Sequence, residues 1–160
     1  MAIVTLTGTL RGPNATIGQG IVSSVKVAQA HVTVGAADSA TSTYSMVYIP
    51  SNARILGASR LHYDDLATSG SPTLDIGLFA VNGNITSDAD ALNDGLDAGA
   101  ASGASAAVVK DKANYGKRAW EFVSGQSTDP GGQLLVKVSL LDADVNQGGD
   151  MFLELFYSLD

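Results

Sequence analysis

The C-terminal stretch of the chain, residues 129–160, most constrains the fold. Asp129-Pro130-Gly131-Gly132 predicts a turn, because Pro presets φ and Gly accepts a positive φ. Residues 134–141 and 151–159 then repeat apolar positions with period two, which predicts two strands with one face in a core. Residues 142–149 break the pattern, so we expect a β-hairpin. Because an apolar terminal strand has to be buried, we expect the C-terminus to be held within a sheet.

Composition indicates one folded domain with an unusual surface. The chain has 160 residues, of which 45% are hydrophobic, enough for a substantial core. Only 16% are charged, compared with about 25% in typical domains. Such a composition is typical of chains with a Ser/Thr/Asn-rich surface, or of chains that cover part of their surface with neighbours.

Charge and cysteine content exclude several classes of function. The net charge is −7, which disfavours nucleic-acid binding, because that binding requires Lys and Arg to neutralise phosphates. No acid precedes Asp38, and the first 37 residues contain only Arg11 and Lys26 as bases. The absence of cysteine excludes disulfides, thiolate metal sites and a cysteine nucleophile. We expect no secretory signal and no membrane span.

The N-terminal residues differ from the rest of the chain. Residues 1–10 alternate loosely and residues 11–20 are rich in Gly, Pro and Asn. One interpretation is a first strand followed by a loop; the other is an extended arm over residues 1–20 that docks on a neighbouring subunit, with the domain over 21–160. The arm's candidate contacts are Ile3, Val4, Leu6, Leu10 and Arg11.

Four further strands are expected before residue 82. They cover residues 21–34, with a bulge near Ala28, and residues 43–49, 54–64 and 73–81. In the last of these, Leu74, Ile76, Leu78 and Ala80 face inward, while Asp75 and Phe79 face outward. Asn82-Gly83 is a strong hairpin signal.

The region 87–123 predicts a short helical or mixed insertion. Ser87 and Asp90 have capping-box spacing, which favours a short helix within 87–97. Residues 98–107 are an Ala/Ser/Gly-rich stretch expected to be a mobile loop. Residues 109–123 have helical spacing, although a strand around 118–123 is the alternative. Short strands at this spacing indicate an all-β fold, an antiparallel β-sandwich of jelly-roll type, with an immunoglobulin-like sandwich second.

No catalytic or metal site stands out. His31 and His62 are the two histidines, and nothing in the sequence places a particular Ser and acid beside either, as a triad requires. Asp142, Asp144 and Asn146 match the first ligand positions of an EF-hand, but Gln147 replaces the required Gly. The acids of 88–97 match no template. We therefore expect no catalytic residues, no metal and no cofactor.

Surface aromatics and basic residues are the candidate contacts with other proteins. Phe152 and Phe156 lie on the face of the last strand opposite its core face, and Phe79 does so on an earlier strand. We expect the insertion at 109–123 or another subunit to cover them, because exposed apolar patches mark interaction sites. Lys112, Lys117 and Arg118 complete the set of candidate contact residues.

Several segments resemble small structural proteins of tailed-bacteriophage virions. These segments are residues 42–56, 64–79, Asn93-Asp94-Gly95, 114–117, Trp120-Glu121-Phe122 and the turn at 128–132. The resemblance covers residues 40–160 and implies a non-enzymatic capsid decoration (cement) protein on the virion surface. It also implies the major capsid protein as partner and a homo-oligomer, with a trimer favoured. The alternatives are a tail or head-fibre component, or a carbohydrate-binding sandwich for host attachment.

Overall fold

The computed structural model describes residues 25–99 and 103–159, and the arm predicted at 1–20 lies outside them. Nine strands and two 3₁₀ helices follow one another along the chain. They are β1 (Lys26–Val34), β2 (Thr43–Pro50), β3 (Arg54–Ile55), β4 (Arg60–Tyr63), β5 (Thr73–Ala80), β6 (Asp88–Asp97), β7 (Ala104–Ala107), η1 (Lys112–Asn114), η2 (Ala119–Phe122), β8 (Gln133–Leu141) and β9 (Gly149–Ser158). Neither helix is long or apolar enough to span a membrane.

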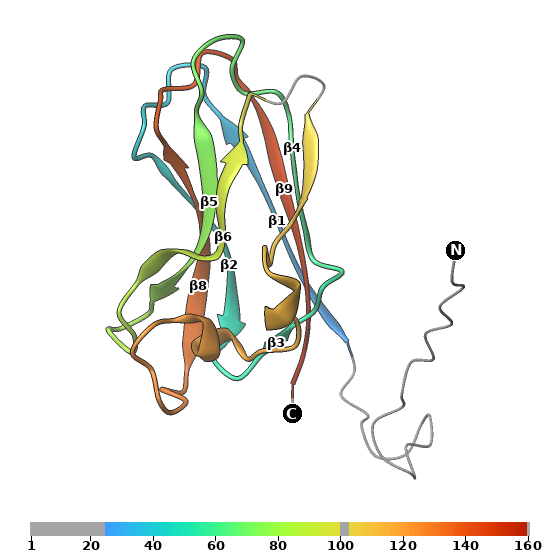
Figure 1. The fold of residues 1–160 in the computed structure, drawn as a ribbon, viewed down its shortest axis with the longest axis vertical. Coiled ribbons are helices and arrows are strands. Elements are labelled where there is room, and N and C mark those ends of the chain that lie inside the picture. The colour runs from blue at the N-terminus through green and yellow to red at the C-terminus, as the bar shows by residue number, and fades with distance from the viewer. Residues whose placement is uncertain (1–24, 100–102, 160) are drawn as a thin grey trace, which may run out of the picture.

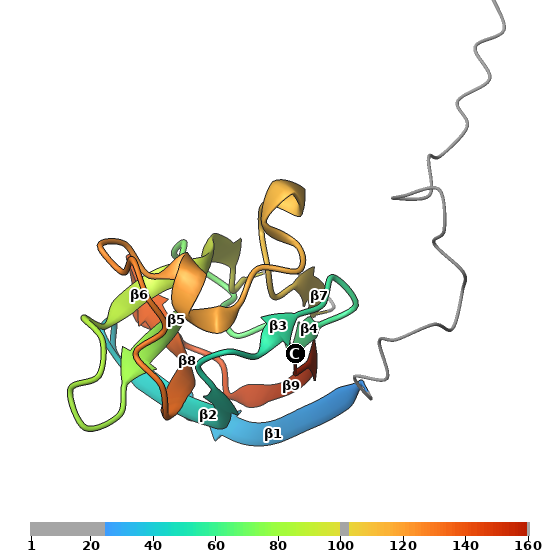
Figure 2. The ribbon, with the colours of Figure 1, turned by 90° about the horizontal axis from the view of Figure 1, so that it is seen from below.

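Two antiparallel sheets pack face to face (Figures 1 and 2). The first, here called sheet A, has the order β1-β9-β4-β7, with β3 also paired to β9; the second, sheet B, has the order β2-β8-β5-β6. Within them the antiparallel pairs are nested: β1 pairs with β9, β2 with β8, β4 with β7, and β5 with β6. This nested order is that of a jelly roll, so the predicted all-β sandwich is confirmed.

The core lies between the sheets and follows the predicted alternation. Sheet B contributes the fully buried Ile49, Leu74, Ile76, Leu78, Leu134, Val136, Val138 and Leu140. Sheet A contributes Ile55, Leu61, Met151, Leu153 and Leu155. The terminal strand β9 lies inside sheet A, between β1 on one side and β3 and β4 on the other, so its predicted burial is confirmed.

The predicted hairpin between the last two strands is wrong. β8 lies in sheet B and β9 in sheet A, so residues 142–148 cross from one sheet to the other. Asp142 has a φ of 66°, and the Val145 side chain is buried where the chain crosses, with its N–H donating to the Asp38 carbonyl. An alternating strand has the same sequence pattern whichever partner it has, so the pattern could not identify the pairing.

The strand predicted over 54–64 is divided into β3 and β4. The Tyr115 ring packs against Gly57, where an added Cβ would lie 2.7 Å from the ring. The chain turns there, and the Ser59 N–H donates to the Leu56 carbonyl. In β1 the predicted bulge near Ala28 is also wrong, because the register with β9 is continuous from Lys26 to Val34.

The helix predicted within 87–97 is strand β6. Ser87 caps no helix; its hydroxyl accepts a hydrogen bond from the Ala80 N–H at the end of β5. β6 pairs with β5 through two irregularities in register, and a Cβ at Gly77 would lie 2.4 Å from the Asp88 carbonyl oxygen. Gly77 therefore lets β6 cross closely over β5, and this pairing outweighs the local helical signal.

The segments after β6 also depart from prediction. Part of the stretch expected to be a loop, 98–107, forms strand β7 at the edge of sheet A. The helix expected over 109–123 is replaced by η1 and η2, which are one turn each. The segment is fixed to the corner around β3 by hydrogen bonds from Gly116 N–H to the Ile55 carbonyl and from Ala119 N–H to the Ala53 carbonyl.

Candidate functional site

The candidate contact residues lie in three places. Phe79 is on the outer face of sheet B, while Phe152 and Phe156 are on the outer face of sheet A. The three basic residues, Lys112, Lys117 and Arg118, lie together around η1 and the start of η2. Ile3, Val4, Leu6, Leu10 and Arg11 lie outside the described residues.

A row of aromatic rings crosses the outer face of sheet A. In the register of the three strands, Phe152 on β9 lies between His31 on β1 and His62 on β4. The rings of His62 and Phe152 are 6.5 Å apart at their centroids. His31 Nε2 lies 3.1 Å from a carboxylate oxygen of Asp150, and His62 Nε2 lies 3.6 Å from one of Glu154.

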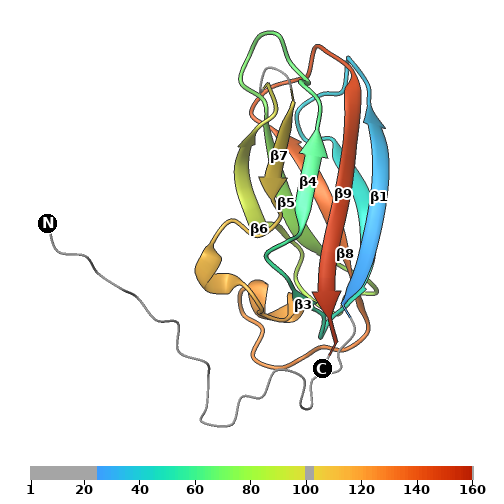
Figure 3. The ribbon, with the colours of Figure 1, turned by 90° about the vertical axis from the view of Figure 1, so that its right-hand side faces the viewer.

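This face was expected to be covered by the 109–123 segment or by another subunit. Figure 3 shows the segment beside β3, at the edge of the sheet, while β9 and its neighbours face the viewer. Phe152 and Phe156 are half-buried by their neighbours on the sheet, and Val27, which pairs with Phe156, is 48% exposed. The face is therefore partly apolar and open.

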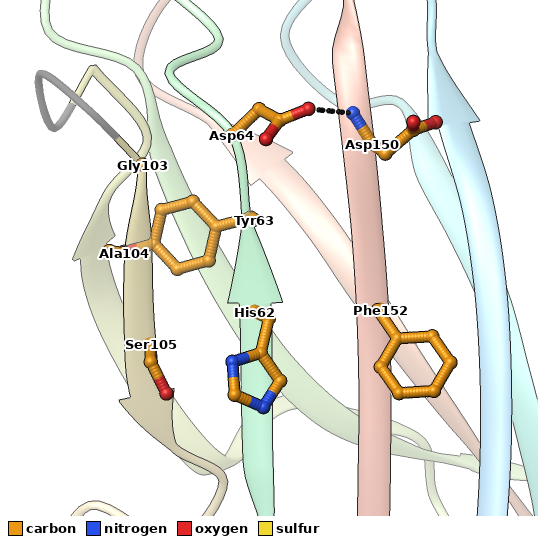
Figure 4. A pocket seen from close by; sticks show the side chains of 8 residues that line it. All are labelled: His62, Tyr63, Asp64, Gly103, Ala104, Ser105, Asp150 and Phe152. Atoms are coloured by element: carbon orange, nitrogen blue, oxygen red, sulfur yellow. Dashed lines mark hydrogen bonds between the residues drawn. The ribbon is translucent and has the colours of Figure 1, made fainter.

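An open hollow of about 360 Å³ lies at one side of this face, over β4 and its two neighbours β7 and β9 (Figure 4). Its lining comprises His62, Tyr63, Asp64, Gly103, Ala104, Ser105, Asp150 and Phe152. Ser105 lies opposite His62 in the register, but among the described residues no hydrogen bond joins the two side chains. The Asp64 carboxylate accepts a hydrogen bond from the Asp150 N–H at 2.8 Å and so holds the backbone of β9.

An apolar strip crosses the outer face of sheet B. Tyr48 on β2 pairs with Leu135 on β8, which pairs with Phe79 on β5. Tyr48 is 57% exposed, and the other two side chains are half-buried. The Lys137 ammonium lies 4.7 Å from the centre of the Phe79 ring, within cation–π range. Tyr48 was not among the predicted contact residues. It lies between Val47 and Ile49, which are buried, so the alternation along this strand could have predicted that its side chain faces outward.

The basic residues lie on a loop that is firmly held. The Asp111 carboxylate accepts the Ala113 N–H and caps η1, and the Glu121 carboxylate accepts the Arg118 N–H. Between these two caps, Lys112, Tyr115 and Lys117 are exposed. Because Tyr115 also packs against Gly57, the loop backbone and this aromatic ring are held in place, while the two lysine side chains extend from the loop into exposed positions.

Burial raises the pKa of three ionisable groups, the Tyr44 and Tyr63 hydroxyls and the Asp75 carboxyl. Asp75, expected to face outward, is only 6% exposed, and burial raises the pKa of its carboxyl although the Gly95 N–H donates to it at 2.7 Å. Burial and the hydrogen bond to Asp38 raise the pKa of the Tyr44 hydroxyl. The Asp75 carboxyl bonds to strand β6 and the Tyr44 hydroxyl bonds to the loop at 35–42, which is a structural role for each.

The acidic loops form no cation cage. Asp142 accepts the Thr73 hydroxyl, Asp144 accepts the Ala40 N–H and Asn146 accepts the Thr68 N–H, so the three side chains point to different partners. Over residues 25–99 and 103–159, no three His, Asp or Glu side chains gather as metal ligands. Turn-forming Asp and Asn side chains account for these loops.

Comparison with known proteins gives a result at the level of fold. No family model matches the chain, and no curated protein matches it. Two solved structures do match. A chain of the capsid asymmetric unit of cyanophage Pam1 aligns with a TM-score of 0.58 and 19% identity, over 98% of this chain and 100% of that one. A chain of the capsid of Ralstonia phage GP4 aligns with a TM-score of 0.63 and 22% identity, over 85% and 84%.

The chain has the fold of phage capsid chains. The resemblance to phage virion proteins in the sequence is thus confirmed at the level of the fold. Identities of 19% and 22% leave individual contact residues without counterparts of known role.

Proposed function

We propose that this protein is a decoration (cement) protein on the outer surface of a phage capsid. It binds the major capsid protein and stabilises the contacts between adjacent capsid subunits. The observation that carries the proposal is the end-to-end match with a chain of a phage capsid asymmetric unit. The exposed apolar side chains on both sheets support it, because a protein that acts by covering its neighbours needs such surface.

The proposed mechanism is linkage by mass action. A protein that binds the assembled shell, but not free capsid subunits, shifts the equilibrium toward the shell. Each copy needs only a modest affinity, because many copies act on one particle. The role is binding, with no chemical step and no cofactor. We propose a homotrimer as the binding unit, since one docking event then joins several capsid subunits.

The test is binding to empty, expanded shells that lack this protein. Purified protein is mixed with the shells and sedimented, and the melting temperature of the shells is measured with and without it. We expect co-sedimentation and a higher shell melting temperature. Protein that stays in the supernatant at saturating concentration would contradict the proposal. Imaging of intact particles separates a shell position from the tail or head-fibre alternative, and glycan-array binding would favour host attachment.

Residues 1–20 are proposed to form a docking arm. Their apolar side chains and their lack of acids suit a groove on an acidic neighbour. Deletion of 1–20 is expected to lower shell occupancy at a given protein concentration while leaving the thermal unfolding of the domain unchanged. Unchanged occupancy would remove the arm from the proposal, and light scattering of both proteins would show whether the trimer depends on it.

A further inference from the structure

The connections at one end of the sandwich, here called the upper end, are acidic. This end is at the top of Figure 1 and comprises residues 35–42, 64–72, 98–99, 103 and 142–148. These connections contain Asp38, Asp64, Asp65, Asp142 and Asp144, while Asp97 and Asp150 lie in the ends of β6 and β9 beside them. No Lys or Arg of the described residues lies in these connections.

The upper-end acids are engaged within the chain. Asp38 accepts the Gly35 N–H and the Tyr44 hydroxyl, and the Asp144 carboxylate accepts the Ala40 N–H. These bonds hold the loops, so the acids are already used for structure. Their side chains nevertheless keep a single sign of charge at this end.

The opposite end, here called the lower end, has a different charge balance. Its connections, residues 51–59, 81–87 and 108–132, contain more bases than acids. The bases are Arg54, Lys110, Lys112, Lys117 and Arg118, and the acids are Asp111, Glu121 and Asp129. Beside these connections, Asp88 and Asp90 lie at the start of β6 and Lys26 lies at the start of β1, so the lower end has charges of both signs, whereas the upper-end connections have only acids. Lys110 pairs with Asp94 on β6, whereas Lys112 and Lys117 are exposed and form no ion pair within the described part of the chain.

Exposed apolar surface gathers at the same end. The exposed large apolar side chains of the described residues are Val25, Val27, Tyr48 and Tyr115. Val25 and Val27 lie at the start of β1, Tyr48 near the end of β2, and Tyr115 beside the corner before β4. Residues 1–24, which contain no acid, join the domain here at Val25.

We propose that the protein docks through its lower end onto an acidic protein surface, with the upper end facing away from it. This inference rests on the proposed capsid binding and names the side that binds and the charge of the partner. Lys112 and Lys117 supply charge complementarity, and the valines and tyrosines supply the apolar area that is desolvated. Docking in the reverse orientation would place the acidic loops against the acidic partner, which charge repulsion disfavours.

The test compares two double variants with the same change in net charge. Lys112→Gln/Lys117→Gln removes two positive charges at the lower end, and Ala37→Glu/Ser71→Glu adds two negative charges in exposed positions at the upper end. Binding to empty shells that lack the protein is measured by co-sedimentation at low salt. We expect the first variant to bind about tenfold or more weakly, and the second to bind within about twofold of the parent protein.

Each outcome of this comparison decides something. Equal weakening of both variants, or weakening of the upper-end variant alone, would overturn the orientation while leaving capsid binding intact. Failure of the parent protein itself to bind would overturn the proposed function and the orientation with it. Unfolding midpoints of both variants serve as the folding control. In addition, amine labelling of the bound protein is expected to protect Lys26, Lys112 and Lys117 more than Lys137.

Discussion

Gly77 illustrates how one residue type determines the local path of the chain. Its missing side chain is replaced by the backbone of β6, since an added Cβ would lie 2.4 Å from carbonyl atoms of Asp88 and Ala89. Backbone at that distance has no rotamer through which to move away, unlike a flexible side chain. The closeness of β6 therefore depends on glycine at this position.

Gly77→Ala is expected to lower the free energy of unfolding by about 3 kcal/mol or more, because overpacking against backbone forces the strands apart. Gly83→Ala is the matched control. Gly83 has a φ of 73° and no atom near an added Cβ, so only backbone strain of about 1 kcal/mol applies. Urea unfolding measures the free energy of unfolding of both variants. An equal loss in Gly77→Ala and Gly83→Ala would contradict the close approach of β6 to Gly77.

Asp75 gives a prediction for pH dependence. Burial raises the pKa of its carboxyl in the folded state above the unfolded value of 3.8, so the ionised form destabilises the fold at neutral pH. This cost disappears as the pH falls through the raised pKa, since the folded state then takes up the proton first. Asp75→Asn keeps the acceptor for the Gly95 N–H and removes the charge.

Asp75→Asn is therefore expected to raise the free energy of unfolding at pH 7 by on the order of 1 kcal/mol. The gain should shrink as the pH falls through the raised folded-state pKa toward 3.8, because the parent carboxyl is then neutral as well. Denaturant unfolding over this pH range measures it. A variant that is less stable than the parent at pH 7 would show that the charge, and not only the acceptor, supports Gly95.

Among the elements, most strands were predictable, but β6 and β7 were expected to be a short helix and a loop, and strand pairing was not predictable. The alternation of Leu134, Val136 and Val138 reports that one side of β8 is buried, whereas in β5 the outward position Asp75 is buried as well. It carries no information on which sheet receives the strand, so β8 and β9 were assigned to one hairpin. Within β6, the local capping signal at Ser87 was outweighed by pairing with β5.

The candidate contact surfaces were predictable to a similar extent. Side chains alternate between the two faces of a strand, and this alternation correctly predicted that Phe79, Phe152 and Phe156 lie on the outer faces. The gathering of exposed apolar and basic side chains at one end was not predictable, because it depends on which connections the topology brings together. Tyr48 and Lys112 are 64 positions apart in the sequence and share an end only through the nested pairing.

Terminal strand β9 is expected to be as important for stability as any internal one. Leu155→Ala empties a fully buried site near the chain end and should cost about 2–5 kcal/mol. Leu135→Ala, on the outer face of β8, is the matched control and should cost less than about 1.5 kcal/mol. Chemical denaturation compares the two, and a smaller loss for Leu155→Ala would indicate a frayed C-terminal strand.

At the scale of the whole molecule, the two ends predict a dependence on salt. If the lower end meets an acidic surface, the shell affinity of the parent protein should fall by about tenfold between 50 and 500 mM NaCl, because added ions screen exposed charges. The shell affinity of the Lys112→Gln/Lys117→Gln variant should change less with NaCl concentration than that of the parent protein. Salt-independent affinity would indicate that apolar contacts alone hold the protein in place.

The nested pairing also has a consequence for synthesis of the protein. The first described strand, β1, pairs with the last, β9. Lys26 can therefore pair with Tyr157 only after residue 157 has been synthesised. Sheet A therefore lacks one of its inner strands until residues 149–158 have been synthesised, and long-range pairing of this kind forms slowly. A nascent chain that stops before residue 149 therefore cannot complete the sandwich, and β1 stays without its partner until then.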